Sequence, residues 1–176
     1  MELEIKYFGD PILEKPCEDF LFTNPPHDPR DLAVSMYKFM EEKNGVGLAA
    51  NQVGIPFNMF VMRSYEDKPC AIFNPRIVSI SEDTNVLDEG CLSVPGFIVK
   101  VKRSAHLRIR YQDELGEVNT NVFTGMTARI IQHEMDHLKG EYYFQGLSRI
   151  VLERAIKYAH KKGYDYTGKG ILKYAK

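Results

Sequence analysis

The stretch Thr127-Ala128-Arg129-Ile130-Ile131-Gln132-His133-Glu134-Met135-Asp136-His137-Leu138-Lys139-Gly140 organises the interpretation of this 176-residue chain. Residues 125–138 contain no proline, Thr124 can cap the N-terminus and Gly140 can close the C-terminus, so the pattern predicts a helix. Two histidines four residues apart project from one helix face about one turn apart. Both imidazoles can therefore reach one metal ion while the intervening glutamate stands beside it as a base, which outlines a hydrolytic metal site.

The same helix is expected to lie in the interior of the molecule. One face carries Met126, Ile130, His133 and His137, and a second apolar stripe carries Ile131, Met135 and Leu138. A helix that is apolar on two sides is usually buried, and burying two histidines is costly unless their nitrogens are satisfied. A metal ion would satisfy them. The alternative to a metal site is a purely structural helix whose histidines hydrogen-bond to the backbone.

Length and composition predict a single globular catalytic domain over residues 1–176. A net charge of -1 gives no general attraction to nucleic acid or anionic lipid, so neither sequence-specific nucleic acid binding nor membrane association is expected. The acidic N-terminus does not resemble a secretory signal, which favours the cytoplasm, or an organellar matrix if a transit peptide was removed. Cys17, Cys70 and Cys91 are odd in number and widely spaced, which predicts free thiols, one of them available as a ligand.

The order of local patterns predicts an α+β fold with largely antiparallel strands packed around the central metal-binding helix. Residues 1–23 are expected to form an N-terminal arm, and a helix should begin at the Asp28 cap and end at Asn44-Gly45. Turns are predicted at residues 64–69 and at Asn74-Pro75. A C-terminal helix over residues 148–162 and a flexible tail over residues 163–176 complete the chain. Strands are predicted at residues 57–62, 70–73, 76–80, 107–111 and 118–123, the last two as a hairpin.

Two further stretches carry chemistry. Gly45-Val46-Gly47-Leu48-Ala49-Ala50-Asn51-Gln52 lets backbone approach another group closely, but it lacks the Lys-Ser/Thr of a phosphate loop. Glu89-Gly90-Cys91-Leu92-Ser93-Val94-Pro95 places a thiol beside small residues and a proline. It is either a strand ending in a turn with a buried thiol, or the source of the third ligand. A two-histidine site needs that ligand to hold a metal ion and still leave a position for water.

Together with Gln132-His133-Glu134-Met135-Asp136-His137-Leu138, these two stretches strongly resemble the three signature motifs of peptide deformylases, in the same order. The similarity extends from Gly9 to about Gly163 and implies the deformylase fold. It implies that Cys91, His133 and His137 are the metal ligands, that Glu134 takes a proton from water and delivers it to the leaving amine, and that Gln52 and the backbone N–H of Leu92 stabilise the oxyanion. The implied reaction removes formate from the N-terminal formylmethionine of newly made chains.

The resemblance also implies a substrate cleft and a cofactor. Residues expected at the cleft and its methionine pocket are Gly45, Gly47, Leu48, Gly90, Met126, Arg129 and Ile130. Arg103 is expected to pair with Glu89 or Asp136 and so to orient the ligands. One divalent ion is expected, Fe²⁺ first, with Zn²⁺, Ni²⁺ and Co²⁺ as alternatives. The partners are N-formylmethionyl peptides and nascent chains. The basic end of the C-terminal helix is either a solvated face or a contact with the ribosome.

The chain departs from the family pattern at Gly96-Phe97-Ile98-Val99, where many bacterial members carry an arginine, and this predicts a more apolar rim. Two other functions compete with the deformylase one. A His-Glu-x-x-His metallopeptidase is the first, although Tyr143 stands where one such class has its third histidine. A catalytically silent metal-binding module is the second, although Glu134 and Gln52 are both retained.

Overall fold

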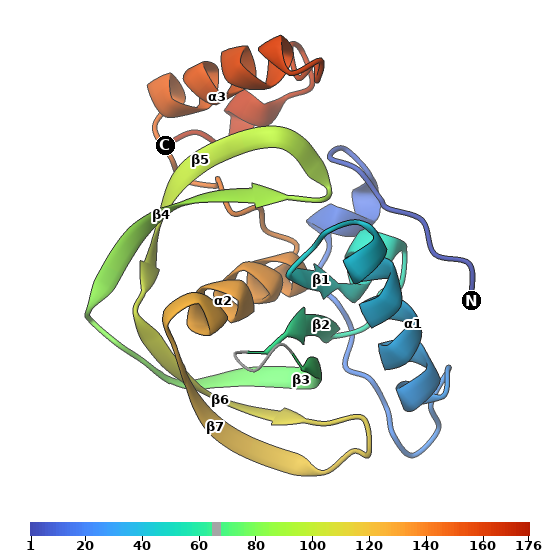
Figure 1. Ribbon diagram of the computed structural model, residues 1–176. Coiled ribbons are helices and arrows are strands. Elements are labelled where there is room, and N and C mark those ends of the chain that lie inside the picture. Colours follow the sequence, from blue (N-terminus) through green and yellow to red (C-terminus); the bar gives the residue numbers. More distant parts are fainter. Residues whose placement is uncertain (65–67) are drawn as a thin grey trace.

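The computed structural model describes residues 1–64 and 68–176 and places two antiparallel sheets around one helix, α2 (Figure 1). The predicted α+β class is confirmed. The larger sheet has the order β1-β2-β3-β6-β7, and β4 and β5 form a separate hairpin. The strands are β1 (Gly47–Ala49), β2 (Met59–Arg63), β3 (Pro69–Ile80), β4 (Thr84–Cys91), β5 (Val94–Ser104), β6 (His106–Gln112) and β7 (Val118–Thr124). The α-helices are α1 (Pro29–Glu42), α2 (Gly125–Lys139) and α3 (Arg149–Lys161), with 3₁₀ turns η1 (Pro11–Glu14), η2 (Ala50–Val53) and η3 (Ile171–Tyr174).

The five-stranded sheet has a helix on each face, and β2 shows why. Successive side chains of a strand point to opposite faces. Met59 and Val61 join the apolar cluster around α1, whereas Phe60 and Met62 join the cluster around α2. Because the β4–β5 hairpin passes over the other side of α2 (Figure 1), this helix lies between two sheets and is buried along most of its length.

The predicted boundaries of α2 are confirmed. Gly140 closes the helix in the left-handed conformation at φ 77°, where a Cβ would lie 2.7 Å from the backbone carbon of Glu14. Glycine is therefore needed both for the turn and for the close passage of the N-terminal arm. Thr124 occupies the N-cap position, but its side chain makes no capping hydrogen bond. Met126 is exposed, so the first turn of the helix lies outside the core.

The predicted helix near residue 28 is also confirmed, and the predicted turn at Asn74-Pro75 is wrong. Asp28 caps α1 by accepting from the backbone N–H groups of Arg30 and Asp31. Asn74, at φ 49°, sits in a register shift within one continuous β3. Its side chain accepts from the backbone N–H of Phe20 at 2.8 Å and donates to the carbonyl of Phe20 at 2.9 Å. The bulge in β3 therefore provides hydrogen-bond partners for the backbone of the N-terminal arm. The predicted turn at residues 64–69 includes residues 65–67, which lie outside the described part of the chain.

The β4–β5 hairpin was not among the predicted strands. Its signal is the alternation of buried Val99 and Val101 with exposed Lys100 and Lys102 in β5. The two strands pair from Thr84 opposite Ser104 to Cys91 opposite Val94, with a register shift after Glu89. The hairpin thereby delivers Cys91 to the middle of the molecule beside α2.

The structure corrects the prediction that residues 163–176 form a flexible tail. Tyr166 and Ile171 are only 6% and 1% exposed and belong to one apolar cluster with Leu152 and Ala155 of α3. The segment is rich in tyrosine, whose large ring contributes burial while its hydroxyl finds a partner. Residues 1–23 run as the predicted arm with one 3₁₀ turn. Within the described ranges, the structure has no helix with the length and apolar character needed to span a membrane.

Candidate metal centre

Cys91, at the end of β4, lies beside His133 and His137 of α2. One potential ligand atom from each residue lies within 4.8 Å of the other two, and Cys91 Sγ is 3.1 Å from His137 Nε2. One thiolate and two imidazoles form a donor set that holds a divalent ion and leaves a coordination position open. The three residues therefore fit a metal ion. Tyr143, which a metallopeptidase of the rival class would replace with a ligand, instead donates its hydroxyl to the carbonyl of Phe97.

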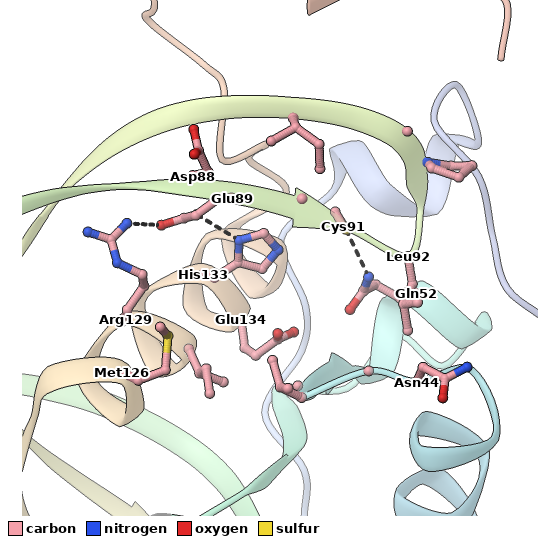
Figure 2. A pocket seen from close by; sticks show the side chains of 18 residues that line it. Asn44, Gln52, Asp88, Glu89, Cys91, Leu92, Met126, Arg129, His133 and Glu134 are labelled. Atoms are coloured by element: carbon pink, nitrogen blue, oxygen red, sulfur yellow. Dashed lines mark hydrogen bonds and ion pairs between the residues drawn. The ribbon is translucent and has the colours of Figure 1, made fainter. Parts of the chain in front are cut away.

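Glu89 connects His133, one of the candidate metal ligands, to Arg103 and Arg129. One carboxylate oxygen accepts from His133 Nδ1 at 2.9 Å (Figure 2). Arg103 donates to both oxygens at 3.0 and 2.9 Å. Arg129 adds a further bond to the same carboxylate. Arg103 also bonds to Asp136, so it pairs with both of its predicted partners. Because Glu89 engages Nδ1 of His133, the other ring nitrogen is left for the metal site.

The charge states around Glu89 follow from these contacts. Burial alone would raise the pKa of Glu89, but His133 and Arg103 lower it to about 2, which keeps the carboxylate charged. Burial would likewise raise the pKa of the Cys91 thiol, but the imidazoles of His137 and His133 hold it well below its usual range. The thiolate is the form that binds metals. Hydrogen bonds to Cys91 and Glu89 overcome burial and raise the pKa of His133 to about 10, so metal binding must displace a proton.

Glu134 is 3% exposed and faces the space between α2 and β1. Burial raises its pKa to about 7, although His133 and His137 partly oppose this effect, and its Oε2 has no hydrogen-bond partner among the described residues. A Cβ at Gly47 would collide with the Glu134 carboxylate and lie 2.8 Å from Ile130 Cγ2, so only glycine leaves room here. A carboxylate with a free oxygen and a pKa near neutrality is suited to exchanging protons with a bound molecule.

Gln52 lies opposite Glu134 and is 2% exposed. Its Oε1 accepts from the backbone N–H of Ala49 at 2.8 Å, which orients the amide. Its Nε2 then donates toward Cys91 Sγ at 3.2 Å and Ser93 Oγ at 3.1 Å. The amide nitrogen therefore points to the same space as the ligand atoms.

These groups border a cavity of about 450 Å³. Of the residues predicted at the cleft, those that line it are Gly45, Gly47, Gly90, Met126, Arg129 and Ile130, and Leu92, the predicted oxyanion donor, lines it as well. Leu48 does not, because alternation along β1 turns its side chain to the α1 core while Gly47 faces α2. Arg129 has a structural role in the wall of the cavity, because its guanidinium also donates to the backbone carbonyls of Val101 and Asn85.

The prediction that Phe97 contributes to an apolar rim is wrong, and other residues at the site were not foreseen. Phe97 is fully buried, whereas its neighbour Ile98 lines the cavity and is 42% exposed. Asn51 is also fully buried, and it donates to the backbone carbonyl of His137 at 2.5 Å, which connects η2 to α2. Tyr143 packs its ring 5.1 Å from that of His133. Asn51 lies 86 residues from His137, and Tyr143 lies 46 residues from Phe97, so no local pattern shows these contacts.

Metal removal should expose one of the three thiols to alkylation. Cys91 lines the cavity and its pKa is lowered, whereas burial raises the pKa of Cys17 to about 12 and that of Cys70 to about 11. Iodoacetamide at neutral pH should therefore modify Cys91 in chelator-treated protein and spare the other two, because the thiolate is the nucleophile. Metal-loaded protein should be protected. Peptide mass spectrometry reads the result, and equal labelling of Cys91 with and without metal would contradict its role as a ligand.

The chain is similar in sequence and in structure to known proteins. The family model described as polypeptide deformylase matches residues 2–152. A peptide deformylase of Synechocystis sp. is 41% identical over 168 residues, which cover 93% of this chain and 87% of that protein. The crystal structure of a Synechococcus elongatus peptide deformylase in complex with actinonin matches with a TM-score of 0.83 at 34% identity, covering 94% of this chain and 88% of that one. A Met-Ala-Ser bound structure from Acinetobacter baumannii matches with a TM-score of 0.75 at 31% identity, over 81% of this chain and 96% of that one.

Proposed function

The chain belongs to the peptide deformylase family, metal-dependent hydrolases that remove the N-formyl group from newly made polypeptides, and we propose how its own residues carry out this reaction. In the proposal, Cys91, His133 and His137 hold one divalent ion. Their clustered ligand atoms are the observation that carries it. When bound, the ion acts as a Lewis acid that lowers the pKa of a water molecule and polarises the formyl carbonyl. The donor set suits Fe²⁺, Zn²⁺, Ni²⁺ and Co²⁺, and the family resemblance favours Fe²⁺.

Glu134 is proposed to move the proton. It takes a proton from water as the water oxygen attacks the formyl carbon, and it returns that proton to the amine nitrogen as the C–N bond breaks. An amine leaves poorly unless it is protonated, so the same group must act first as base and then as acid. A pKa of about 7 supports both roles, and so does Oε2, which has no hydrogen-bond partner in the part of the chain that the structure describes.

Gln52 Nε2 and the backbone N–H of Leu92 are proposed to stabilise the negative charge that develops on the formyl oxygen. Gln52 is already oriented by Ala49, so its donor needs little rearrangement during the reaction. Preorganised donors aimed at a developing charge help the transition state more than the ground state. The formylmethionine side chain is proposed to enter the part of the cavity bordered by Met126 and Ile130.

Formate release tests this function. Protein purified without oxygen is mixed with formyl-Met-Ala-Ser, and the metal content of the same sample is measured. Formate together with about one metal ion per chain supports the deformylase activity and identifies the working ion. Cleavage of an unformylated peptide would instead support the metallopeptidase, and metal without formate would support the silent module.

We further propose that the protein acts in the cytoplasm and that it contacts the ribosome. The exposed basic side chains at the end of α3 include Lys157, Lys161 and Lys162, and we propose that they contact the ribosome, where formylated chains emerge. Changing all three lysines to glutamine should weaken co-sedimentation with ribosomes while leaving peptide deformylation intact. Undiminished co-sedimentation would remove this contact from the proposal.

A further inference from the structure

The start of β5 forms one side of the cavity. Pro95, Gly96 and Ile98 line it, and they are called the cleft wall below. The wall begins three residues after Leu92 in the sequence. Ile98 is 42% exposed, whereas Glu134 is 3% exposed, so the wall reaches the solvent end of the cavity while the reacting groups lie at its floor.

Two tyrosine hydroxyls form hydrogen bonds with the backbone of the cleft-wall region. Tyr166 donates to the carbonyl of Pro95 at 2.8 Å, and Tyr143 donates to the carbonyl of Phe97 at 2.5 Å. These carbonyls lie on either side of Gly96. The two donors come from different parts of the chain, and Tyr166 belongs to the C-terminal segment.

Gly96 is covered by a second tyrosine of that segment. It adopts the left-handed conformation at φ +74°, and a side-chain carbon added to it would collide with the ring of Tyr164. The neighbouring Phe97 ring lies 5.8 Å from that of Tyr166 at a steep angle. Ring packing and a hydrogen bond therefore act together on three consecutive residues of the wall region.

The C-terminal segment is itself anchored away from the cavity, so it can transmit a fixed position to the wall. The backbone N–H of Lys176 donates to Leu147 at 3.0 Å, and that of Gly146 donates to Tyr174 at 2.9 Å. The Tyr174 hydroxyl donates to Glu14 in the N-terminal arm at 2.6 Å. In Figure 1 the segment, coloured red, passes between α3 and β5.

We propose that residues 164–176 form a C-terminal clamp that positions the cleft wall for peptide binding, with Tyr166 as its positioning residue. The clamp serves the part of the substrate that extends beyond the formylmethionine, because the wall lies at the open end of the cavity. This inference rests on the proposed deformylase function. It assigns a role in substrate binding to a segment that lies outside the three signature motifs.

The test compares two tyrosines of the clamp that each lose only a hydroxyl. In Tyr166→Phe, the KM for formyl-Met-Ala-Ser should rise about three- to tenfold, the loss expected from one hydrogen bond, with kcat changed by less than about twofold. The short substrate formyl-Met amide should show no change. Tyr174→Phe breaks the bond to Glu14 but leaves the wall bond and the two backbone bonds with Gly146 and Leu147 in place, so the segment stays anchored and this variant should behave as the wild type with both substrates.

Each outcome decides between the clamp and a general structural role. A wild-type KM in Tyr166→Phe overturns the clamp. Equal losses with both substrates, or in both variants, also overturn it, because general loosening would not depend on peptide length. Metal content and thermal unfolding of each variant are measured alongside. If the wild-type protein itself releases no formate, the proposed function fails, and that result is distinct from failure of the clamp.

Discussion

Glu134→Gln should abolish formate release while the protein keeps its metal ion. Glutamine has nearly the same shape as glutamate, so it fits the space that Gly47 leaves beside α2, but it can neither accept the water proton nor return it to the amine. Loss of a general acid–base group typically costs about 10²- to 10⁴-fold in rate. The measurement is kcat for formyl-Met-Ala-Ser with metal analysis of the same preparation. Activity within tenfold of the wild type would rule out the assigned role.

A matched control and a pH experiment separate chemistry from folding. Glu141→Gln removes an exposed carboxylate just after the same helix and should leave kcat unchanged. Burial raises the folded-state pKa of Glu134 to about 7 from an ordinary 4.5, so ionisation of this group destabilises the metal-free fold as the pH rises between those values. In chelator-treated protein, Glu134→Gln should therefore increase the free energy of unfolding at pH 8 and have no such effect at pH 4.

Glu89→Gln should destabilise the fold and weaken metal binding. The substitution keeps the side-chain shape but removes the charge that faces Arg103, Arg129 and His133. Leaving buried charges without their partner typically costs about 3 to 5 kcal/mol. Loss of the group that orients a histidine ligand typically costs about 10- to 100-fold in metal affinity. Denaturant unfolding at pH 7 and competition with a chromophoric chelator measure the two effects.

The pH dependence of this difference provides a second check. Because the pKa of Glu89 is depressed to about 2 in the folded chain, its contribution is complete above about pH 4.5 and is lost as the pH falls through about 2. The gap in unfolding free energy between wild type and Glu89→Gln, measured without metal, should shrink from pH 6 toward pH 3. Asp88→Asn is the control, since Asp88 is exposed and pairs with Lys100 at 3.4 Å on the surface, where such pairs contribute about 0 to 1 kcal/mol. A gap independent of pH would contradict the charged network.

Local patterns were sufficient for the elements whose determinants lie close together in the sequence. The Asp28 cap set the start of α1, Gly140 set the end of α2, and alternation predicted the β6–β7 hairpin. The same patterns failed at Asn74, where an apparent turn is a bulge stabilised by contacts with Phe20. They also failed in the C-terminal segment, whose tyrosines find their partners in other elements. Propensity describes a residue and its neighbours, whereas burial depends on what packs against them.

By itself the sequence determined the metal helix, the pair of histidines on one of its faces and the candidate third ligand, because helical spacing and residue chemistry specify these directly. Only the tertiary structure decided that Glu89 joins His133 to two arginines, that Gly47 makes room for Glu134 and that Tyr166 holds the wall beside Cys91. These partners are separated by forty or more residues in the chain, apart from Arg103 and Glu89, which are 14 residues apart. Their meeting depends on strand register and on the packing of whole elements, which a local pattern does not encode.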